Sequence, residues 1–463
     1  MKPKSKIRFP ERVLAALLLV TGSASGLAAC AAGSGVRAAT PSSPPRVQPE
    51  ASPALAAGAV VPTSLDPVAS DPPEQTAVAT GPGGELAELA AFFRALAELE
   101  RGARQEHVRI AWLGDSHSAA DFLPNAVRSA LVARFGTGGP GFMHAGVRHN
   151  RHSNARVEQL GRWRTEPLAP SSSQAQGDGI YGLGGMRVRC ESPDCRLSIE
   201  LLSGAVRDRA LWQVLYRLPQ RARLRVRVGA EGPRQLEGAG GPTRVQRARF
   251  SGAPADKLKI EVVAGRPEVF GVIVEGSEPG VVLDTLGING ARLATPLAWD
   301  EAAWTEELEA RRPELVVMAY GTNEAFERRP VARYREHLTA LVGRWRRVAP
   351  LASCLVLGPP DGAFQQRARI GEIDALLRIV AAELGCAHFS LSAAMGGPGS
   401  FERWARVWPP LAAPDRVHLT PKGYVELGRM LATRLLAAQA GAQNSALTRA
   451  PPPRVSVGPR RTR

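Results

Sequence analysis

The sequence predicts a three-layer α/β fold, in which a parallel sheet is covered by helices on both faces, with a β-sandwich inserted into one loop. Short apolar runs of β type alternate with helical patterns up to residue 135 and again from residue 281, as they do in βαβ units that form a parallel sheet. Between residues 150 and 280 the helical patterns stop. Short strand-like runs separated by Gly and Pro follow one another there, which is typical of a sandwich.

The α/β part can be followed element by element. It begins after Glu85 with an amphipathic helix, in which large apolar residues recur every three or four positions. The strands of the sheet are expected at Val108–Trp112, Val281–Leu286, Leu315–Tyr320, Cys354–Leu357 and Ala387–Leu391. The helices that cover them are expected up to Phe135 and at Asp300–Arg311, Pro330–Arg347, Ile370–Leu384 and Pro421–Gln439.

The inserted segment offers six candidate strands: Leu197–Leu202, Leu211–Leu218, Leu224–Val228, Val245–Phe250, Leu258–Val263 and Phe270–Val274. In the third of these, aliphatic residues alternate with Arg, so that one face of the strand would be apolar and the other charged. The sequence therefore predicts an α/β domain in two parts, 84–150 and 281–440, with a β-sandwich at 151–280.

The two ends of the chain are expected to lie outside the folded domain. Residues 1–29 have a basic head, a short apolar stretch and small residues at the end, as secretory signals do. The ending Leu27-Ala28-Ala29-Cys30 resembles the bacterial lipobox, which implies acylation of Cys30 and attachment to a membrane. An ordinary cleaved signal with an incidental cysteine is the alternative. Residues 30–83 and 441–463 read as a disordered tether and a disordered basic tail.

This N-terminus predicts an exported protein that is lipid-anchored in the cell envelope. Because Ala31 follows the cysteine, where an Asp would retain a lipoprotein at the inner membrane, the outer membrane is expected in a Gram-negative host. The formal net charge of +16 does not indicate nucleic-acid binding, since part of it lies in the two ends and the body intersperses acids with bases. Hydrophobic residues at 44% and charged residues at 22% exclude wholesale disorder and a polytopic membrane protein.

Four cysteines remain besides Cys30, an even number that suits an oxidising compartment. Cys190 and Cys195 could close a small loop. Cys354 and Cys386 each lie near the start of a predicted strand, so they could pair between adjacent strands or remain free buried thiols. Neither spacing suits zinc, because the chain has no C-x-x-C pair.

Four short motifs place polar residues at predicted strand ends or just before the last helix. They are Gly114-Asp115-Ser116, Gly287-Ile288-Asn289-Gly290, Gly321-Thr322-Asn323-Glu324 and Asp415-Arg416-Val417-His418. An Asp three residues before a His can hold the imidazole Nδ1–H and leave Nε2 free as a base. Each motif alone is also compatible with a structural, non-catalytic role: an N-cap serine, a glycine turn, a turn asparagine, or a loop carboxylate beside a surface histidine.

Together, in this order, the four motifs resemble the blocks of the SGNH or GDSL hydrolase superfamily, whose domain is flavodoxin-like. The resemblance implies that Ser116 is the nucleophile, that His418 is the general base and that Asp415 orients it. It also implies an oxyanion hole made by the Ser116 N–H, the Gly290 N–H and the Asn323 side chain. Gly290 is preferred to Gly287 because the donor glycine of the family lies a few residues beyond its strand. The chain departs from the commonest pattern at His117, where Leu is usual.

A narrower resemblance covers residues 85–440. It rests on Gly114-Asp115-Ser116-His117-Ser118-Ala119-Ala120-Asp121-Phe122, and also on Arg134–Phe142, Tyr320–Phe326 and Leu357–Asp361. These segments look like the bacterial peptidoglycan O-acetylesterase branch, whose members carry a carbohydrate-binding-like β-sandwich between the first and second blocks.

The resemblance implies a serine esterase that removes O-acetyl groups from an envelope polysaccharide through an acetyl-serine intermediate, with peptidoglycan as the expected substrate. No metal or organic cofactor is expected. His144, His149 and His152 have spacings that fit no common metal site, and the neighbouring arginines would repel a cation. A monomer is expected. Two alternatives stay open: an O-acetyltransferase or esterase for another acetylated carbohydrate, and a glycan-binding lipoprotein without catalysis.

Overall fold

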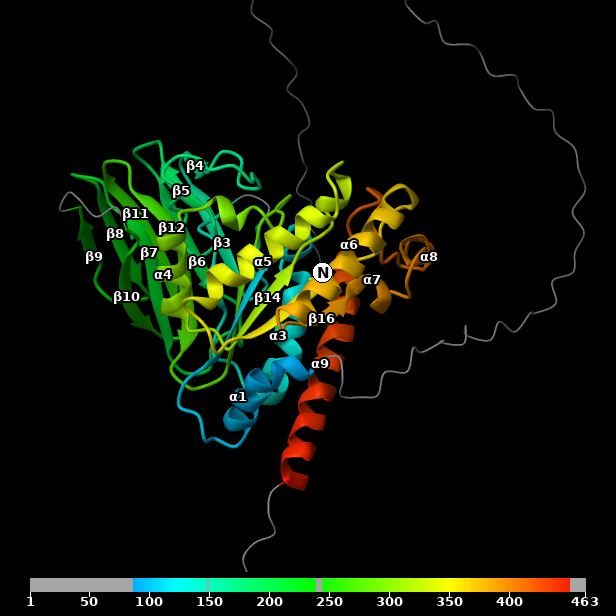
Figure 1. Ribbon diagram of the computed structural model, residues 1–463. Helices are drawn as coiled ribbons and strands as arrows, with labels where there is room; N and C mark the ends of the chain where they lie inside the picture. The colour runs from blue at the N-terminus through cyan, green and yellow to red at the C-terminus, as the bar shows by residue number, and fades with distance from the viewer. Residues whose placement is uncertain (1–85, 148–149, 239–243, 450–463) are drawn as a thin grey trace, which may run out of the picture. The chain divides into compact units, whose positions relative to one another are not determined.

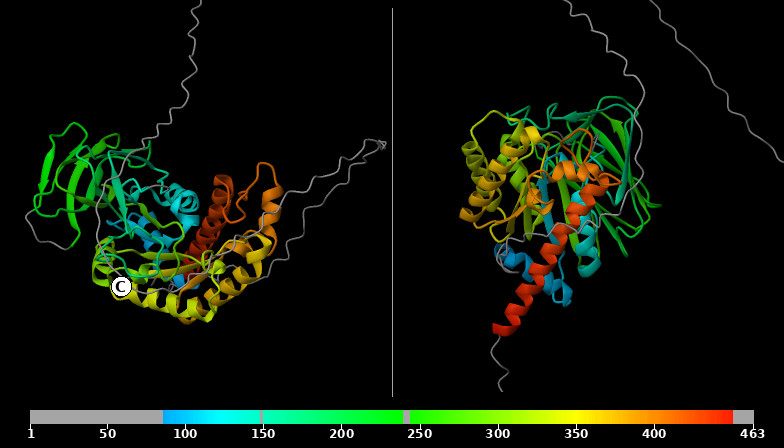
Figure 2. Two further views of the ribbon diagram at one scale, coloured as in Figure 1. Left: turned by 90° about the horizontal axis from the view of Figure 1, so that it is seen from above. Right: turned by 90° about the vertical axis from the view of Figure 1, so that its right-hand side faces the viewer.

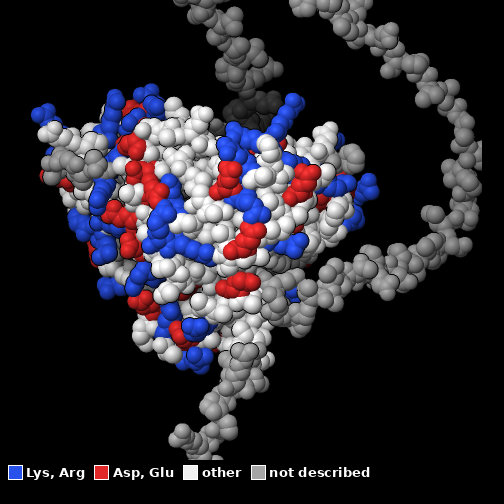
Figure 3. All heavy atoms as spheres, in the orientation of Figure 1, with Lys and Arg blue, Asp and Glu red and all other residues white. Residues whose placement is uncertain are grey.

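The computed structural model describes residues 86–147, 150–238 and 244–449 (Figures 1 and 2). The expected signal peptide, the lipidation site Cys30 and the expected tether lie outside the described residues, as does His149. Basic and acidic side chains are interspersed on the face seen in Figure 3, without a large field of one sign. In the described part of the chain, no helix combines the length and hydrophobicity that crossing a membrane requires.

The central sheet is parallel and has the order β13-β1-β14-β15-β16. Its strands are β1 (Val108–Gly114), β13 (Val281–Gly287), β14 (Leu315–Ala319), β15 (Ser353–Gly358) and β16 (Ala387–Ser390). All residues of β13, β14 and β15 are buried, as expected when helices cover both faces of a parallel sheet. The predicted α/β class and all five predicted strands are confirmed.

Alternate residues of β1 pack into two different hydrophobic cores. Ile110 and Trp112 face the core shared with η1 (Ala87–Leu89), α1 (Ala90–Glu100), α3 (Phe122–Phe135) and α9 (Pro421–Arg449). Ala111 and Leu113 face the core formed with η2 (Pro296–Ala298), α4 (Glu301–Arg311), α5 (Ala332–Arg346) and α6 (Phe364–Glu383). The period-two alternation of a strand therefore produces the two helical layers visible in Figure 2.

Helix α9 continues past the domain boundary predicted at residue 440 and ends at Arg449, so the predicted disordered tail is corrected at its start. Gln439 is fully buried, and the side chain of Gln443 donates to Glu100 at the end of α1 at 3.0 Å. The bond between Gln443 and Glu100 ties the extra turns of α9 to α1. The remaining short helices are α2 (Ser116–Ala119), η3 (Glu324–Phe326), α7 (Leu391–Ala394) and α8 (Ser400–Arg406).

The inserted segment forms two antiparallel sheets, as the sandwich prediction requires. One has the order β10-β7-β12-β5-β4, with β2 also paired to β12, and the other has the order β3-β6-β11-β8-β9. The six predicted strands correspond to β6 (Arg196–Leu201), β7 (Ala210–Arg217), β8 (Arg223–Val228), β10 (Gln246–Gly252), β11 (Lys257–Ala264) and β12 (Glu268–Gly276). The pattern missed β3 (Ala155–Leu160), β4 (Trp163–Glu166), β5 (Arg187–Cys190) and β9 (Arg234–Glu237).

The sandwich and the α/β part are joined through a strand that precedes the predicted boundary at residue 150. Strand β2 (Gly141–Met143) pairs with β12 of the sandwich, while the Phe142 N–H donates to the Asp284 carboxylate on β13 at 2.8 Å. Arg311 at the end of α4 clasps the same carboxylate through two bonds of 2.8 and 3.0 Å. One hydrophobic core accordingly runs from the sandwich into the α/β part.

The structure resolves the alternatives left open for the cysteines by forming two disulfides. Cys190 pairs with Cys195 at the end of β5, and Cys354 of β15 pairs with Cys386, which immediately precedes β16. The second bond links neighbouring strands of the central sheet.

Candidate active site

Ser116 stands at the carboxyl end of β1, as the first residue of the short helix α2. The Asp115 carboxylate caps this helix by accepting the His117 N–H at 2.9 Å. Two glycines let α2 lie directly on the sheet. A Cβ on Gly114 would lie 2.3 Å from the Ser118 hydroxyl, and one on Gly287 would lie 2.5 Å from the Ala119 nitrogen. The sequence G-D-S therefore places a half-buried serine at the sheet edge.

The structure brings the three predicted catalytic side chains into contact. Ser116 Oγ lies 2.8 Å from His418 Nε2, and His418 Nδ1 lies 2.8 Å from Asp415 Oδ2. The other oxygen of Asp415 accepts the backbone N–H groups of Val417 and His418 at 3.0 and 2.9 Å. This is the hydrogen-bonded order of a serine–histidine–aspartate triad, with Nε2 placed to take the serine proton.

Asp415 remains ionised in this setting. Partial burial raises the pKa of its carboxyl, but the hydrogen bonds from the backbone N–H groups of His418 and Val417 and from the His418 ring outweigh it, so the pKa lies below its ordinary value. The side chains of Asp415 and His418 are 52% and 39% exposed. The acid and base of the triad thus stand at an open rim of the site.

The two loops expected to carry the oxyanion donors are tied to each other. Asn323 Nδ2 donates to the Ala291 carbonyl at 3.0 Å, next to Gly290, whose φ of 78° lies in the left-handed region that favours glycine. Within the described part of the chain, neither the Ser116 N–H nor the Gly290 N–H donates a hydrogen bond. Both are therefore available to a developing oxyanion, and the predicted roles of Gly290 and Asn323 stay predictions.

Glu324 is a site residue to which the sequence analysis gave no role. Its buried carboxylate accepts the Leu293 N–H at 2.8 Å and the Gly321 N–H at 3.0 Å. It therefore links the loop that contains Gly290 to the loop that contains Asn323. Burial raises the pKa of Glu324 to about 7. The signal that could have found it is an acidic residue in the loop after a buried strand, one position beyond the motif asparagine.

His117, the departure from the commonest family pattern, lies beside the catalytic base. Its Nδ1 is 2.9 Å from the hydroxyl of Tyr424 in the first turn of α9, and its ring centroid is 5.4 Å from that of His418. Burial, with the nearby His418, lowers the pKa of His117 to about 3. A neutral His117 does not repel the imidazolium that forms on His418 during catalysis. Tyr424 also stacks on Phe122, which packs against Arg151.

Two of the histidines considered as metal ligands, His144 and His152, lie within the described residues. His144 and His152 are buried beside β2 and the start of the sandwich, and burial lowers the pKa of each, to about 3 and about 4. No group of three or more His, Cys, Asp or Glu side chains within the described ranges is placed to hold a metal ion.

Comparison with known proteins agrees with this geometry. Residues 265–425 match the family model of the GDSL-like Lipase/Acylhydrolase family. The segment forms a GDSL hydrolase domain. The matched span includes Asn323, Asp415 and His418 but not Ser116, which precedes the inserted sandwich in sequence. In the folded chain, Ser116 nevertheless lies within hydrogen-bonding distance of His418.

Over most of its length, the chain is similar to a solved structure of a peptidoglycan O-acetylesterase. The TM-score is 0.66 at 25% sequence identity, and the match covers 78% of this chain and 99% of that one. A family two carbohydrate esterase from Cellvibrio japonicus matches with a TM-score of 0.27 and 10% identity, over 62% of this chain and 99% of that one.

A phospholipase A1 from Streptomyces albidoflavus NA297 has a TM-score of 0.26 and 17% identity, over 33% of this chain and 80% of that one. No curated protein sequence matches the chain. The GDSL domain, the triad and the first of these structures together make the protein an SGNH-type esterase for acyl or acetyl esters.

Proposed function

We propose that this esterase removes O-acetyl groups from peptidoglycan. The observation that carries the proposal is the likeness to a peptidoglycan O-acetylesterase across 99% of that chain, joined to a complete triad. The likeness includes the sandwich as well as the hydrolase domain. The exposed rim formed by Asp415 and His418 suits a bulky polymer, because a sugar within a chain can reach the serine there.

The proposed reaction follows from the contacts of the triad. Ser116 Oγ attacks the acetyl carbonyl carbon as His418 Nε2 takes the hydroxyl proton, and Asp415 holds the imidazolium in place. The carbonyl oxygen becomes an oxyanion and receives hydrogen bonds from the Ser116 N–H, the Gly290 N–H and the Asn323 amide. Collapse breaks the bond to the sugar oxygen, which takes the proton from His418. Water, activated by His418, then hydrolyses the acetyl-serine and releases acetate.

The test is acetate release from O-acetylated peptidoglycan compared with acetylated xylan. The proposal expects a higher kcat/KM on peptidoglycan and no release by the Ser116→Ala variant. Equal or better activity on xylan would assign the enzyme to another acetylated carbohydrate. Transfer of acetyl groups to added acceptor sugars, in place of release to water, would identify a transferase.

We also propose that the enzyme works from a membrane anchor on Cys30, as the lipobox-like segment Leu27–Cys30 suggests. The residues between this cysteine and the first described helix would then span the distance from the membrane to the polymer, and the sandwich would help to position the glycan. The Cys30→Ser variant should appear in the soluble fraction with its signal still cleaved. Unchanged membrane partition of that variant would reject the anchor.

A further inference from the structure

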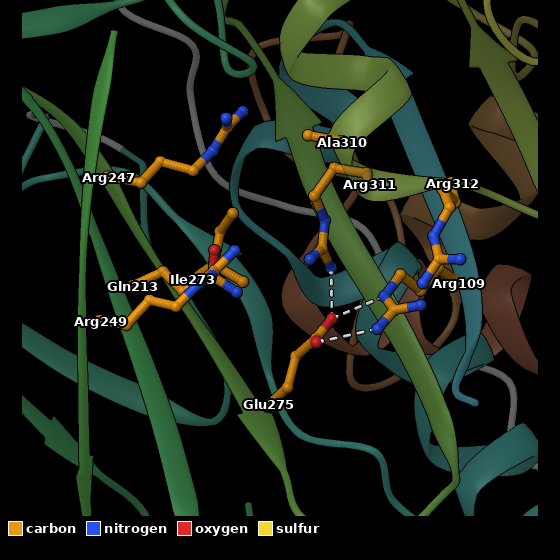
Figure 4. Close-up of a pocket in the computed structure, with 9 residues that line it drawn as sticks. All are labelled: Arg109, Gln213, Arg247, Arg249, Ile273, Glu275, Ala310, Arg311 and Arg312. Carbon is orange, nitrogen blue, oxygen red and sulfur yellow. Dashed lines mark hydrogen bonds and ion pairs between the residues drawn. The ribbon is translucent and has the colours of Figure 1, made fainter. Parts of the chain in front are cut away.

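A cavity lies near the amino-terminal end of β1, opposite the end that is followed by the catalytic serine, where α4 and β1 meet the sandwich (Figure 4). Its volume is about 220 Å³. Arg109, the second residue of β1, lines it, whereas Ser116 follows the last residue of that strand. At about 3.3 Å per residue, the cavity is roughly 20 Å from the serine. It is therefore separate from the active site.

Five guanidinium groups and one carboxylate line this cavity. Its charged lining consists of Arg109, Arg247, Arg249, Arg311, Arg312 and Glu275. Figure 4 shows these arginines arriving from both sides, Arg247 and Arg249 from β10 of the sandwich and the others from β1 and the end of α4. Because like charges repel, such a grouping is stable only when anions balance it.

The floor of the cavity is already balanced. Glu275 accepts two bonds from Arg109 at 2.8 and 3.0 Å and pairs with Arg311 at 2.8 Å. Arg311 is also clasped by the Asp284 carboxylate. Burial raises the pKa of Glu275, but Arg311 and Arg109 outweigh it and hold the pKa at about 2. Two arginines and two carboxylates thus cancel one another there.

The walls carry the surplus positive charge. Arg247 pairs with Glu307 at 2.9 Å, and burial raises the pKa of Glu307 to about 7, so this carboxylate is only partly ionised near neutral pH. Arg312 has an outward partner, Glu106, in a pair whose members are both more than half exposed. Arg249 is exposed, and no carboxylate within the described ranges lies within 4.0 Å of it.

We propose that this cavity is a second binding site, for a carboxylate or phosphate group carried by the envelope polymer on which the esterase acts. Guanidinium groups bind both anions through paired, charge-assisted hydrogen bonds. A volume of about 220 Å³ admits one such group but not a run of sugars. The identity of the polymer rests on the proposed function, whereas the anion site does not. Binding a charged group of the polymer roughly 20 Å from Ser116 would keep the polysaccharide chain on the enzyme while its acetyl esters are cleaved.

The first experiment measures binding of inorganic phosphate by calorimetry. Arg249→Ala should weaken it by about tenfold or more, because a charge-assisted bond is lost. The matched control is Arg227→Ala on β8, another exposed sandwich arginine that has no ion pair among the described residues. This control should bind phosphate as the wild type does. Arg249→Lys should keep part of the affinity. Equal phosphate affinity of Arg249→Ala and the wild type would refute the anion site.

The second experiment identifies the source of the anion. KM for acetate release is compared on peptidoglycan with stem peptides, on the same glycan with the peptides removed, and on glycan carrying phosphate-rich polymer. Arg249→Ala should raise KM severalfold only on the material that supplies the anion, with hydrolysis of a small chromogenic acetyl ester unchanged. An unchanged KM on all three would refute the polymer-binding role even if phosphate binding is lost. Failure of every peptidoglycan substrate with the wild type would instead refute the proposed function and leave the phosphate result standing.

Discussion

Replacing Asn323 with Ala separates a catalytic role from a structural one, because this side chain makes one hydrogen bond to the residues that the structure describes. Its Nδ2 donates to the Ala291 carbonyl at 3.0 Å from a half-buried position. An amide nitrogen has two hydrogens, so the bond to Ala291 fixes the plane of the amide and leaves the second hydrogen for the oxyanion. Asn323→Ala removes both functions at once.

The two losses have different sizes and different readouts. Loss of the bond to Ala291 should cost about 1 kcal/mol of stability, which corresponds to a fall in Tm of about 2–4 °C in a domain of this size. Loss of the oxyanion donor should lower kcat by roughly 10²–10³-fold. KM should move little, since the bond strengthens only as charge develops on the carbonyl oxygen.

The assay records kcat, KM and Tm on one preparation with a chromogenic acetyl ester. Asn323→Asp serves as the near-isosteric variant: it cannot donate, and it should lose kcat as Asn323→Ala does. Glu324→Gln is the control for the tie between the loops, since it perturbs the same two loops without removing the proposed donor. An Asn323→Ala enzyme with a lowered Tm and full kcat would refute the oxyanion role and leave Asn323 as a loop tie.

Three further outcomes are expected. Asp415→Asn should lower kcat by roughly 10–10²-fold, which is less than the loss in His418→Ala. The reason is that the half-exposed carboxylate of Asp415 stabilises the His418 imidazolium through a contact that solvent screens. A loss of kcat in Asp415→Asn as large as that in His418→Ala would contradict this. Replacing Cys354 and Cys386 with Ala should reduce the free energy of unfolding by about 3–4 kcal/mol, since their bond closes a separation of 32 residues; urea midpoints equal to the wild type would contradict it. Burial lowers the folded-state pKa of His144 to about 3, so its contribution to stability is complete above pH 6.5 and is lost as pH falls towards 3. His144→Leu should therefore flatten the acid-side decline by about 1.4 kcal/mol per pH unit between the two pKa values. Urea unfolding at pH 5.5, 5.0 and 4.5 measures this slope, and parallel declines of the variant and the wild type would reject the explanation.

The sequence was most informative where the chain is buried on both sides. Strand β14 is a continuous apolar run, and the other four strands of the central sheet are mainly apolar, with one or two polar residues each. The positions just after three of the five strands supplied Ser116, Gly290 and Asn323. The triad was predictable because Asp415 and His418 lie three residues apart in one loop, so that their contact depends on local geometry. The role of Ser116 as the partner of His418 was predicted from the order of the motifs and from the family resemblance.

What the sequence could not supply depends on contacts between distant segments. Strand β3 was missed because three of its six residues are polar or charged and it lies at the edge of its sheet, so the sequence shows little apolar alternation there. The role of Glu324 depends on Leu293, in another loop, and that of His117 on Tyr424, which is 307 positions away in sequence. No local pattern records pairings of this kind.

The bond between Phe142 and Asp284 bears on how the enzyme could be re-engineered. A cassette cut at residues 151 and 280 would leave β2 behind, strip β12 of a neighbour and open the shared core. Grafting this sandwich onto another esterase would therefore require carrying β2 together with an aspartate on the receiving strand and an arginine to neutralise it. By the same reasoning, the sandwich and the α/β part should unfold in a single calorimetric transition. Insertion of a flexible linker between them should lower both kcat/KM and the free energy of unfolding.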